Sequence, residues 1–446
     1  MFGFFCYFVY IPMQTLQQLQ NGELKGATTL KLAEQLLHFP EEIFELADTL
    51  EYLDLSFNSL SSLPPDFGRL QKLKIFFCSE NQFTVLPEVL ADCPLLDIVG
   101  FKSNLIETVP AKAINPNLRW LILTNNKVNE LPAEIGNCHR MQKLMLAGNR
   151  LKTLPPSLSN CQNLELLRIA ANQLDELPQW LLSMPKLSWL AFSGNNFNHK
   201  HAVKSIEKID WSEFEMKHLL GEGASGIISQ AAWNNHGVVK DVAVKIFKGA
   251  VTSDGLPQDE MDACIVAGNH EGLVKLIGEI ANHPDNKKGL VMELIPKSFF
   301  NLGLPPSLAS CTRDVFKPEM RLSVNQVLKI VSTIASVAEH LHSNGIMHSD
   351  LYAHNTLIDG EGNTLFGDFG AASFYDKTEK AVAEKLERIE VRAFGCFLDD
   401  LIGLCLEKDH PEIHVLSTMR DSCITYTIGQ RPKFGDLTIW LAKLIK

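Results

Sequence analysis

Several features are missing from this 446-residue sequence, and each absence excludes a class of protein. The ten cysteines form no CxxC pair and no metal-type spacing, which argues against a zinc module or a disulfide scaffold. The net charge of −11 gives no basic excess of the kind that a general nucleic-acid binder needs. Hydrophobic residues make up 46% and charged residues 21%, as in an ordinary globular protein. We therefore expect reduced thiols, a cytoplasmic location and no nucleic-acid partner.

The first twelve residues, MFGFFCYFVYIP, are apolar but lack the basic leader and the cleavage site of a signal peptide. A membrane span takes about 20 apolar residues, so this run is too short to be one. We interpret residues 1–12 as an extension and Met13 as the functional start, with a weak membrane-surface anchor as the alternative. Residues 1–24 are thus assigned to an N-terminal extension and cap.

The first half of the chain repeats itself with a period of 22 or 23 residues. Each repeat is a strip of the type LxxLxLxxN, and its asparagine stands at position 58, 81, 104, 126, 149, 172 or 195. Such a period predicts a solenoid whose leucines share one core. Gln35, 23 residues before Asn58, marks a degenerate capping repeat, which makes about eight repeats over residues 25–198. We expect the asparagines to form a ladder that bonds the backbone where the chain turns. Three cysteines twelve residues after a repeat asparagine (Cys93, Cys138 and Cys161) are predicted to be equivalent packing positions.

This half resembles the short, LP-containing type of leucine-rich repeat, and that resemblance implies a concave face of parallel strands that carries a protein partner. Alternation along each strip assigns Trp120, Ile122, Met145 and Trp189 to this face. An exposed apolar patch usually marks an interface. We expect a separate protein, a second copy or the second half of the chain to cover it. The alternative is that the array only stabilises its neighbour.

After a polar linker, residues 199–211, the second half opens with a glycine motif. Gly221, Gly223 and Gly226 form GxGxxG, and the residues on both sides are strand-like. The motif therefore fits a loop between two strands of a hairpin, over nucleotide phosphates, better than a dinucleotide-binding turn that opens a helix. Further along, VAVK places Lys245 on a buried strand, where an ammonium group is expected to meet an anion.

Two later motifs carry the chemistry of phosphoryl transfer. His348-x-Asp350-x4-Asn355 is followed, 18 residues after Asp350, by Asp368-Phe369-Gly370. A carboxylate is needed to orient an acceptor hydroxyl and take its proton. An amide oxygen and a second carboxylate are the ligands that hold Mg²⁺ against phosphates.

Residues 212–446 resemble a protein kinase domain, and the resemblance implies ATP and Mg²⁺ (or Mn²⁺) as cofactors. It implies that Asp350, Lys245 and Asn355 are catalytic and that Asn355 and Asp368 bind the metal. Glu260 would pair with Lys245, although Asp259 and Asp262 are rivals for that place. The implied nucleotide-binding residues are Gly221, Gly223, Gly226, Ile228, Ala243, Lys245, Glu260, Met292 as gatekeeper, and the backbone of Glu293 and Ile295.

The whole order resembles the leucine-rich-repeat-containing protein kinases of bacteria and plants, in the tyrosine-kinase-like branch, which mostly phosphorylates serine and threonine. We therefore expect an α/β leucine-rich-repeat solenoid followed by an α+β bilobal protein-kinase-like domain. The expected activity is transfer of the γ-phosphate of ATP to Ser/Thr, or Tyr, hydroxyls of a protein substrate.

The sequence also departs from the kinase pattern. Ser349 replaces the usual arginine, Tyr352 replaces a lysine, and Glu390 stands for an aspartate. Only 22 residues separate Asp368 from Glu390, and no APE motif is present. Arg431 therefore lacks its expected partner, and much of the peptide-docking platform is missing or rebuilt. Residues 297–325 are interpreted as a nonstandard insertion. Two hypotheses follow: an active kinase with an unusual acceptor site, or a pseudokinase scaffold that binds nucleotide and partners.

Overall fold

The computed structural model describes residues 13–198, 205–223, 225–248, 251–252 and 254–444. Residues 1–12, interpreted above as an extension, lie outside these ranges, and so do residues 199–204 of the predicted linker. The described residues divide into two compact units. One holds residues 13–187 and 195–197, and the other holds residues 188–194, 198 and 205–444. The domain boundaries of the sequence analysis remain predictions.

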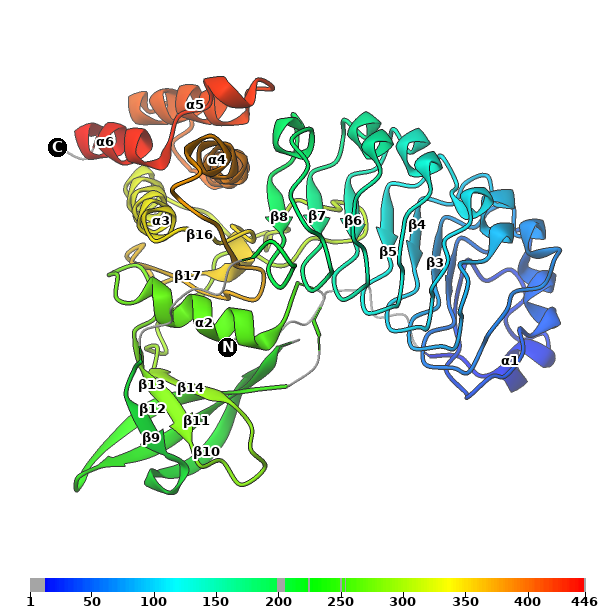
Figure 1. Cartoon of the computed structure of the whole chain (residues 1–446), viewed down its shortest axis with the longest axis horizontal. Helices are drawn as coiled ribbons and strands as arrows, with labels where there is room; N and C mark the ends of the chain where they lie inside the picture. Colours follow the sequence, from blue (N-terminus) through cyan, green and yellow to red (C-terminus); the bar gives the residue numbers. More distant parts are fainter. Residues whose placement is uncertain (1–12, 199–204, 224, 249–250, 253, 445–446) are drawn as a thin grey trace. The chain divides into compact units, whose positions relative to one another are not determined.

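The first unit is a repeat array opened by a short helix, α1 (Leu16–Gln20), whose first turn is capped by the side chain of Thr15. Parallel strands follow in sequence order, in register with one another, as Figure 1 shows. They are β1 (Thr29–Lys31), β2 (Tyr52–Asp54), β3 (Ile75–Phe77), β4 (Ile98–Gly100), β5 (Trp120–Ile122), β6 (Lys143–Met145) and β7 (Leu166–Arg168).

A short 3-10 helix follows most strands. These are η1 (Glu41–Leu46), η2 (Phe67–Arg69), η3 (Glu88–Asp92), η4 (Ala111–Ala113), η5 (Ala133–Asn137), η6 (Pro156–Asn160) and η7 (Leu181–Ser183). A proline of the repeat signature, such as Pro87 or Pro110, stands immediately before several of them. The fixed φ of proline suits a helix start, and its missing N–H costs nothing there.

The repeat asparagines tie each coil to the one before it. Asn149 donates to the carbonyls of Leu146 and Leu123, both at 2.9 Å, and its oxygen accepts from the N–H of Val128 at 2.9 Å. The other repeat asparagines make equivalent hydrogen bonds, as Asn58 and Asn172 do. The predicted ladder is therefore present, and each asparagine side chain bonds backbone groups of its own coil and of the coil before it. Since buried backbone groups left without partners are costly, this pattern explains why each turn uses asparagine.

The core between the coils is apolar. The three recurrent cysteines are fully buried, and each thiol contacts a carbonyl of the preceding coil, as Cys138 does with Asn115 O at 3.4 Å. Phenylalanine rings also pack from coil to coil, with Phe76 and Phe101 at 5.7 Å between centroids. These contacts agree with the shared core that the period predicted.

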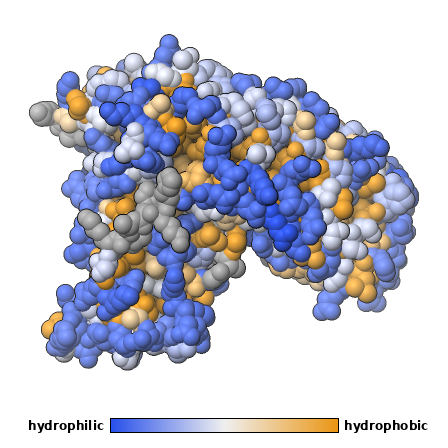
Figure 2. Space-filling model, in the orientation of Figure 1, coloured by the Kyte–Doolittle hydropathy of each residue, from blue (hydrophilic) through white to orange (hydrophobic). Residues whose placement is uncertain are grey.

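The prediction of an exposed apolar patch is wrong for three of its four residues. Trp120, Met145 and Trp189 are 8%, 9% and 1% exposed, and Ile122 is half-buried. One reason is that strand spacing brings neighbouring side chains of a column together: the Lys143 ammonium lies 4.1 Å from the centre of the Trp120 ring. On the face drawn in Figure 2, the surface around α1 is mostly hydrophilic with scattered hydrophobic residues.

The second unit has an N-terminal lobe built on a six-stranded sheet in the order β10-β11-β12-β14-β13-β9. Its elements are β9 (Lys208–Asp210), η8 (Trp211–Glu213), β10 (Phe214–Glu222), β11 (Gly226–Asn235), β12 (Val238–Phe247), α2 (Pro257–Ala267), β13 (Leu276–Ala281) and β14 (Gly289–Glu293). The predicted glycine hairpin is β10 and β11, and β9 lies within the segment predicted as linker.

The C-terminal lobe is mainly helical. It contains β15 (Phe300–Asn301), α3 (Val324–Ser343), β16 (Ile346–Met347), η9 (Ala353–Asn355), β17 (Thr356–Ile358), β18 (Thr364–Phe366), β19 (Ser373–Phe374), α4 (Lys380–Leu404), α5 (Pro411–Ile424), η10 (Ile428–Gln430) and α6 (Phe434–Leu444). This unit also includes the strand β8 (Trp189–Ala191). The expected repeat solenoid and bilobal α+β domain are thus both confirmed. No helix in the described part of the chain is long and apolar enough to cross a membrane.

Candidate active site

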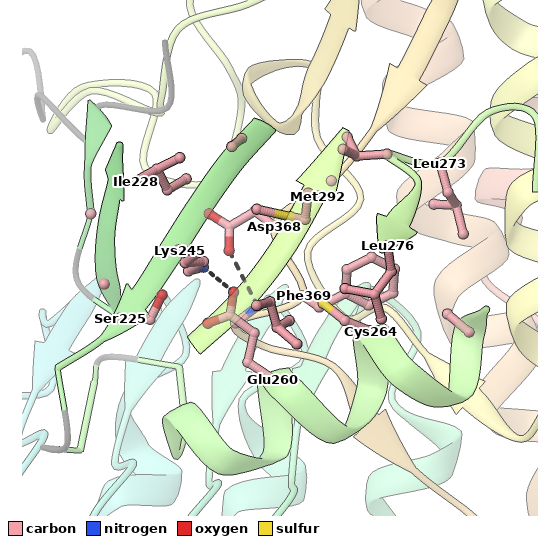
Figure 3. A pocket seen from close by; sticks show the side chains of 18 of the residues that line it. Ser225, Ile228, Lys245, Glu260, Cys264, Leu273, Leu276, Met292, Asp368 and Phe369 are labelled. Atoms are coloured by element: carbon pink, nitrogen blue, oxygen red, sulfur yellow. Dashed lines mark hydrogen bonds and ion pairs between the residues drawn. The ribbon is translucent and has the colours of Figure 1, made fainter. Parts of the chain in front are cut away.

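A pocket lies where the N-terminal sheet, helix α2 and the segment after β18 come together. Figure 3 shows Lys245 of β12 and Glu260 of α2 pointing toward each other, with Asp368 beside them. Ten of the predicted catalytic, nucleotide-binding and metal-binding residues line it: Gly223, Gly226, Ile228, Ala243, Lys245, Glu260, Met292, Glu293, Ile295 and Asp368. Gly221, Asp350 and Asn355 are not among the lining residues.

Lys245 and Glu260 form a buried ion pair. The Lys245 ammonium contacts Glu260 Oε1, and the two side chains are 12% and 3% exposed. Burial alone would lower the pKa of Lys245, but Glu260 and Asp368 outweigh that effect and hold this pKa above its usual value. The two alternative partners of Lys245 have other neighbours. Asp262 accepts a hydrogen bond from Gln258, and burial together with Asp262 raises the pKa of Asp259 to about 6.

Residues of the glycine loop and of strand β14 also line the pocket. Gly223 N–H donates to Gly226 O at 2.9 Å, and a Cβ on Gly226 would lie 2.7 Å from Ile246 O. Position 226 therefore tolerates only glycine without a backbone shift. Glu293 N–H donates to Lys275 O, so its carbonyl is the backbone group it can offer to a ligand.

The loop that holds Asp350 is fixed from below by Glu390 of α4. Glu390 is buried and accepts from His348 N–H at 3.2 Å and Ser349 N–H at 2.5 Å, while His342 Nε2 lies 2.8 Å from its Oε2. Burial alone would raise the pKa of Glu390, but these imidazole and N–H groups hold it below its usual value. Glu390, which stands where the kinase pattern has an aspartate, thus anchors the loop that holds Asp350.

Asn355 fixes the carboxylate itself. Its side-chain N–H donates to Asp350 Oδ2 at 2.7 Å and to Asp350 O at 3.0 Å. Ser349 adopts a φ of +67°, a left-handed conformation that is uncommon for serine. Such conformations concentrate at functional sites, where surrounding bonds hold them.

Residues 297–325, interpreted from the sequence as an insertion, contact the same loop. Asp314 binds His354, through Nδ1 at 2.7 Å and the backbone N–H at 3.0 Å. The neighbouring Arg313 pairs with Asp399 and Asp400 of α4. Burial alone would lower the pKa of His354, but Asp314 outweighs it and raises this pKa, which favours a charged imidazole. Residues 297–325 therefore tie the catalytic loop to α4.

Asp368, predicted from the sequence to bind the metal, lies beside the Lys245–Glu260 pair. It adopts a φ of +62°, and its Oδ1 accepts from Gly370 N–H at 3.2 Å. Burial first, and then Glu260 and Asp350, raise its pKa to about 6, whereas Lys245 lowers it. Three carboxylates thus face one ammonium in this region, and Glu260 Oε2 is buried without a hydrogen bond in the described structure. Such an excess of buried negative charge fits a divalent cation.

The segment after Gly370 is short, as the spacing indicated. Strand β19 pairs with β16, Tyr375 N–H donates to Gly345 O, and α4 begins at Lys380. Arg431 is buried and donates to the carbonyls of Thr425 and Arg388.

Sequence reasoning missed the apolar part of the pocket. These lining residues are Leu220, Cys264, Leu273, Leu276, Leu290 and Phe366, among others. They carry no motif, because any apolar residue of the right size can face an adenine ring. The alternation of β13 and β14 could have pointed to Leu276 and Leu290.

Known protein families match both halves of the chain. Residues 214–394 match the protein tyrosine and serine/threonine kinase model, and residues 139–197 and 49–70 match two leucine-rich-repeat models. The chain carries leucine-rich repeats and a protein kinase domain. The kinase match extends from β10 into α4 and so contains the pocket, the catalytic loop and Asp368.

Curated relatives of this chain include two probable serine/threonine-protein kinases of Dictyostelium discoideum. One is 29% identical over 38% of this chain and 10% of its own length, and the other, gdt4, is 30% identical over 34% and 8%. The chicken tyrosine-protein kinase receptor TYRO3 is 29% identical over 36% of this chain and 19% of its own. The matched segments thus make up less than a fifth of these relatives.

Proposed function

We propose that this chain is an ATP-dependent protein kinase that transfers the γ-phosphate to serine or threonine hydroxyls. The observation that carries the proposal is a set of neighbouring groups: the Lys245–Glu260 pair and Asp368 line one pocket, and Asp350, held by Asn355, is close enough to help raise the pKa of Asp368. The names of the two Dictyostelium relatives support serine and threonine as acceptors, and TYRO3 keeps tyrosine as the competing acceptor.

Each group has a distinct task in this proposal. Lys245, oriented by Glu260, holds the α- and β-phosphates, and Asp350 orients the acceptor hydroxyl and takes its proton. Asn355 and Asp368 would hold Mg²⁺ or Mn²⁺. Such a cation would neutralise the charge on the phosphates. The adenine would lie between Ile228, Ala243 and Met292, against the backbone of Glu293 and Ile295, with the glycine loop from Gly221 to Gly226 over the phosphates.

A transfer assay with radiolabelled ATP and Mg²⁺ tests the proposal. Asp350→Asn keeps the size of the side chain but removes the base, so transfer should fall by about a hundredfold or more. The MgATP-induced rise in melting temperature should remain. Phosphoamino-acid analysis of the product decides between serine, threonine and tyrosine. Absence of transfer by the wild type, with MgATP binding intact, would establish the pseudokinase scaffold that Tyr352 in place of lysine favours.

Activity should not depend on phosphorylation of the segment after Gly370. Ser349 has no cation to receive a phosphate, it is fully buried, and its N–H is bound to Glu390. Phosphatase treatment of active protein should change the initial rate by less than about twofold. A loss of tenfold or more would show that another basic group reads a phosphate.

The repeat array is proposed to bind a protein partner or substrate through its concave strands. Half-buried Ile75, Ile122 and Lys143 are the side chains of β3, β5 and β6 that a partner can reach on that face. A cytoplasmic location is proposed because the nine cysteines in the described ranges are all free thiols.

A further inference from the structure

The segment between Gly370 and α4, where a protein acceptor would bind, is short in this kinase domain. Between Gly370 and the start of α4 at Lys380 there are nine residues, and β19 takes up two of them. In protein kinases the corresponding segment is ordered through new charged contacts when the enzyme is activated. This chain has too few residues there to form such a segment, so the loop that carries Asp350 depends on contacts from elsewhere, of which those with Glu390 and Asp314 are described above.

Residues 188–198 contact the short segment directly. Phe192 N–H donates to Ser373 Oγ at 2.9 Å, and Ser193 Oγ donates to Ala372 O at 2.8 Å. Asn198 Nδ2 donates to Phe374 O at 3.3 Å. Three successive residues, 372–374, therefore accept hydrogen bonds from Phe192, Ser193 and Asn198, which follow strand β8 and belong to the same compact unit as residues 372–374.

Trp189 of β8 contacts the catalytic loop itself. Its ring lies parallel to that of Tyr352, with 4.5 Å between centroids and 7° between planes. The indole N–H donates to Leu351 O at 3.2 Å. Leu351 and Tyr352 follow Asp350 directly, and Trp189 is 1% exposed. Arg392 of α4 donates to Ser188 Oγ at 2.7 Å and fixes the start of the strand.

These contacts coexist with an assembled site. With β8 in place, Lys245 pairs with Glu260, and Asn355 holds Asp350. An inhibitory element would be expected to separate such groups or to occupy the pocket, yet residues 188–198 are not among those that line it. The contacts therefore favour support of the loop over inhibition.

We infer that Trp189 is a positioning residue for phosphoryl transfer, which holds Leu351 and Tyr352, and through them Asp350, in the place where a long activation segment would act. The inference rests on the proposed kinase function. It also gives Tyr352 a task. The tyrosine ring is the surface on which Trp189 stacks, a contact that lysine at this position could not make in the same way.

The test compares three variants of the full chain. Trp189→Ala removes both contacts, Trp189→Phe keeps an aromatic ring but not the N–H donor, and Trp180→Ala is a matched control in the preceding repeat. Trp189→Ala should lower kcat by about tenfold to a hundredfold with an unchanged KM for ATP, since small displacements of a catalytic group are costly. Trp189→Phe should recover much of the rate, and Trp180→Ala should match the wild type.

Hydrogen exchange gives a readout that does not depend on activity. Trp189→Ala should speed exchange of the amides of residues 346–355 and 371–375 by about tenfold, with little change in β10–β12. If Trp189→Ala does not fold, Trp189→Phe and Ser193→Ala take its place in the test. Both should lower kcat and speed exchange of the same amides. Unchanged exchange and kcat, equal effects in Trp180→Ala, or a rise in kcat would overturn the inference. If the wild type transfers no phosphate, the proposed function fails, and exchange alone decides whether Trp189 holds the loop.

Discussion

Lys245→Met should reduce phosphoryl transfer by about a thousandfold. A preorganised cation that faces developing phosphate charge in a pocket poor in water typically contributes two to three orders of magnitude in rate. Methionine has a similar length but no charge, so the phosphates lose their contact with β12. Initial rates with saturating MgATP, compared with those of the wild type, give the measurement.

The same substitution should also destabilise the domain. Glu260 is 3% exposed on its side chain, and without Lys245 it stays buried beside Asp368 with no cation. Removing one partner of a buried pair typically costs about 3–5 kcal/mol. A loss of activity in Lys245→Met would therefore not by itself separate chemistry from folding.

Lys245→Arg provides the matched control. Arginine keeps the charge and can still pair with Glu260, so urea unfolding should give a free energy close to that of the wild type. Its planar fork cannot reproduce the point contact of an ammonium group with the phosphates, and transfer should still fall by about a hundredfold. Wild-type turnover in Lys245→Arg and Lys245→Met together would show that Lys245 does not contact the nucleotide.

The parts of this molecule that could be predicted from sequence are those whose chemistry or geometry fixes both residue type and spacing. A coil of the solenoid needs an asparagine at the same point of each turn, and the structure uses Asn149 in the predicted way. The kinase motifs could be predicted for the same reason, because a phosphate, a metal ion and an acceptor hydroxyl each require one kind of side chain. Lys245 and Glu260 could be paired from a spacing of 15 residues, and the ion pair is present.

The parts that could not be predicted depend on contacts between distant segments. The bond from Trp189 to Leu351 spans 162 residues, and nothing in the repeat period distinguishes Trp189 from Trp120. The contact of Asp314 with His354 joins an insertion of no recognisable pattern to the catalytic loop. The burial of Trp120, Met145 and Trp189 could not be predicted either. Alternation along a strand tells which side of the sheet a side chain faces, but not which other residues cover it.

Asp368→Asn should abolish the stabilisation by MgATP and yet make the protein without nucleotide more stable. The carboxylate is the main fixed charge available to the metal, so its loss should remove the Mg²⁺-dependent thermal shift and lower turnover by about a thousandfold or more. Asparagine keeps the oxygen that accepts from Gly370 N–H, so the local turn should persist.

The gain in stability follows from the raised pKa of Asp368, about 6 against an ordinary value of 3.8. The folded state holds this proton more tightly than the unfolded chain, so ionisation above pH 6 opposes folding. That shift corresponds to at most about 3 kcal/mol, which Asp368→Asn should recover at pH 8. The wild type should gain stability relative to the variant as the pH falls from 7 to 4, and the two melting temperatures should converge near pH 4. A variant that is less stable than the wild type at pH 8 would contradict this account of the charge cluster, and an unchanged shift with MgATP would contradict the assignment of Asp368 to the metal.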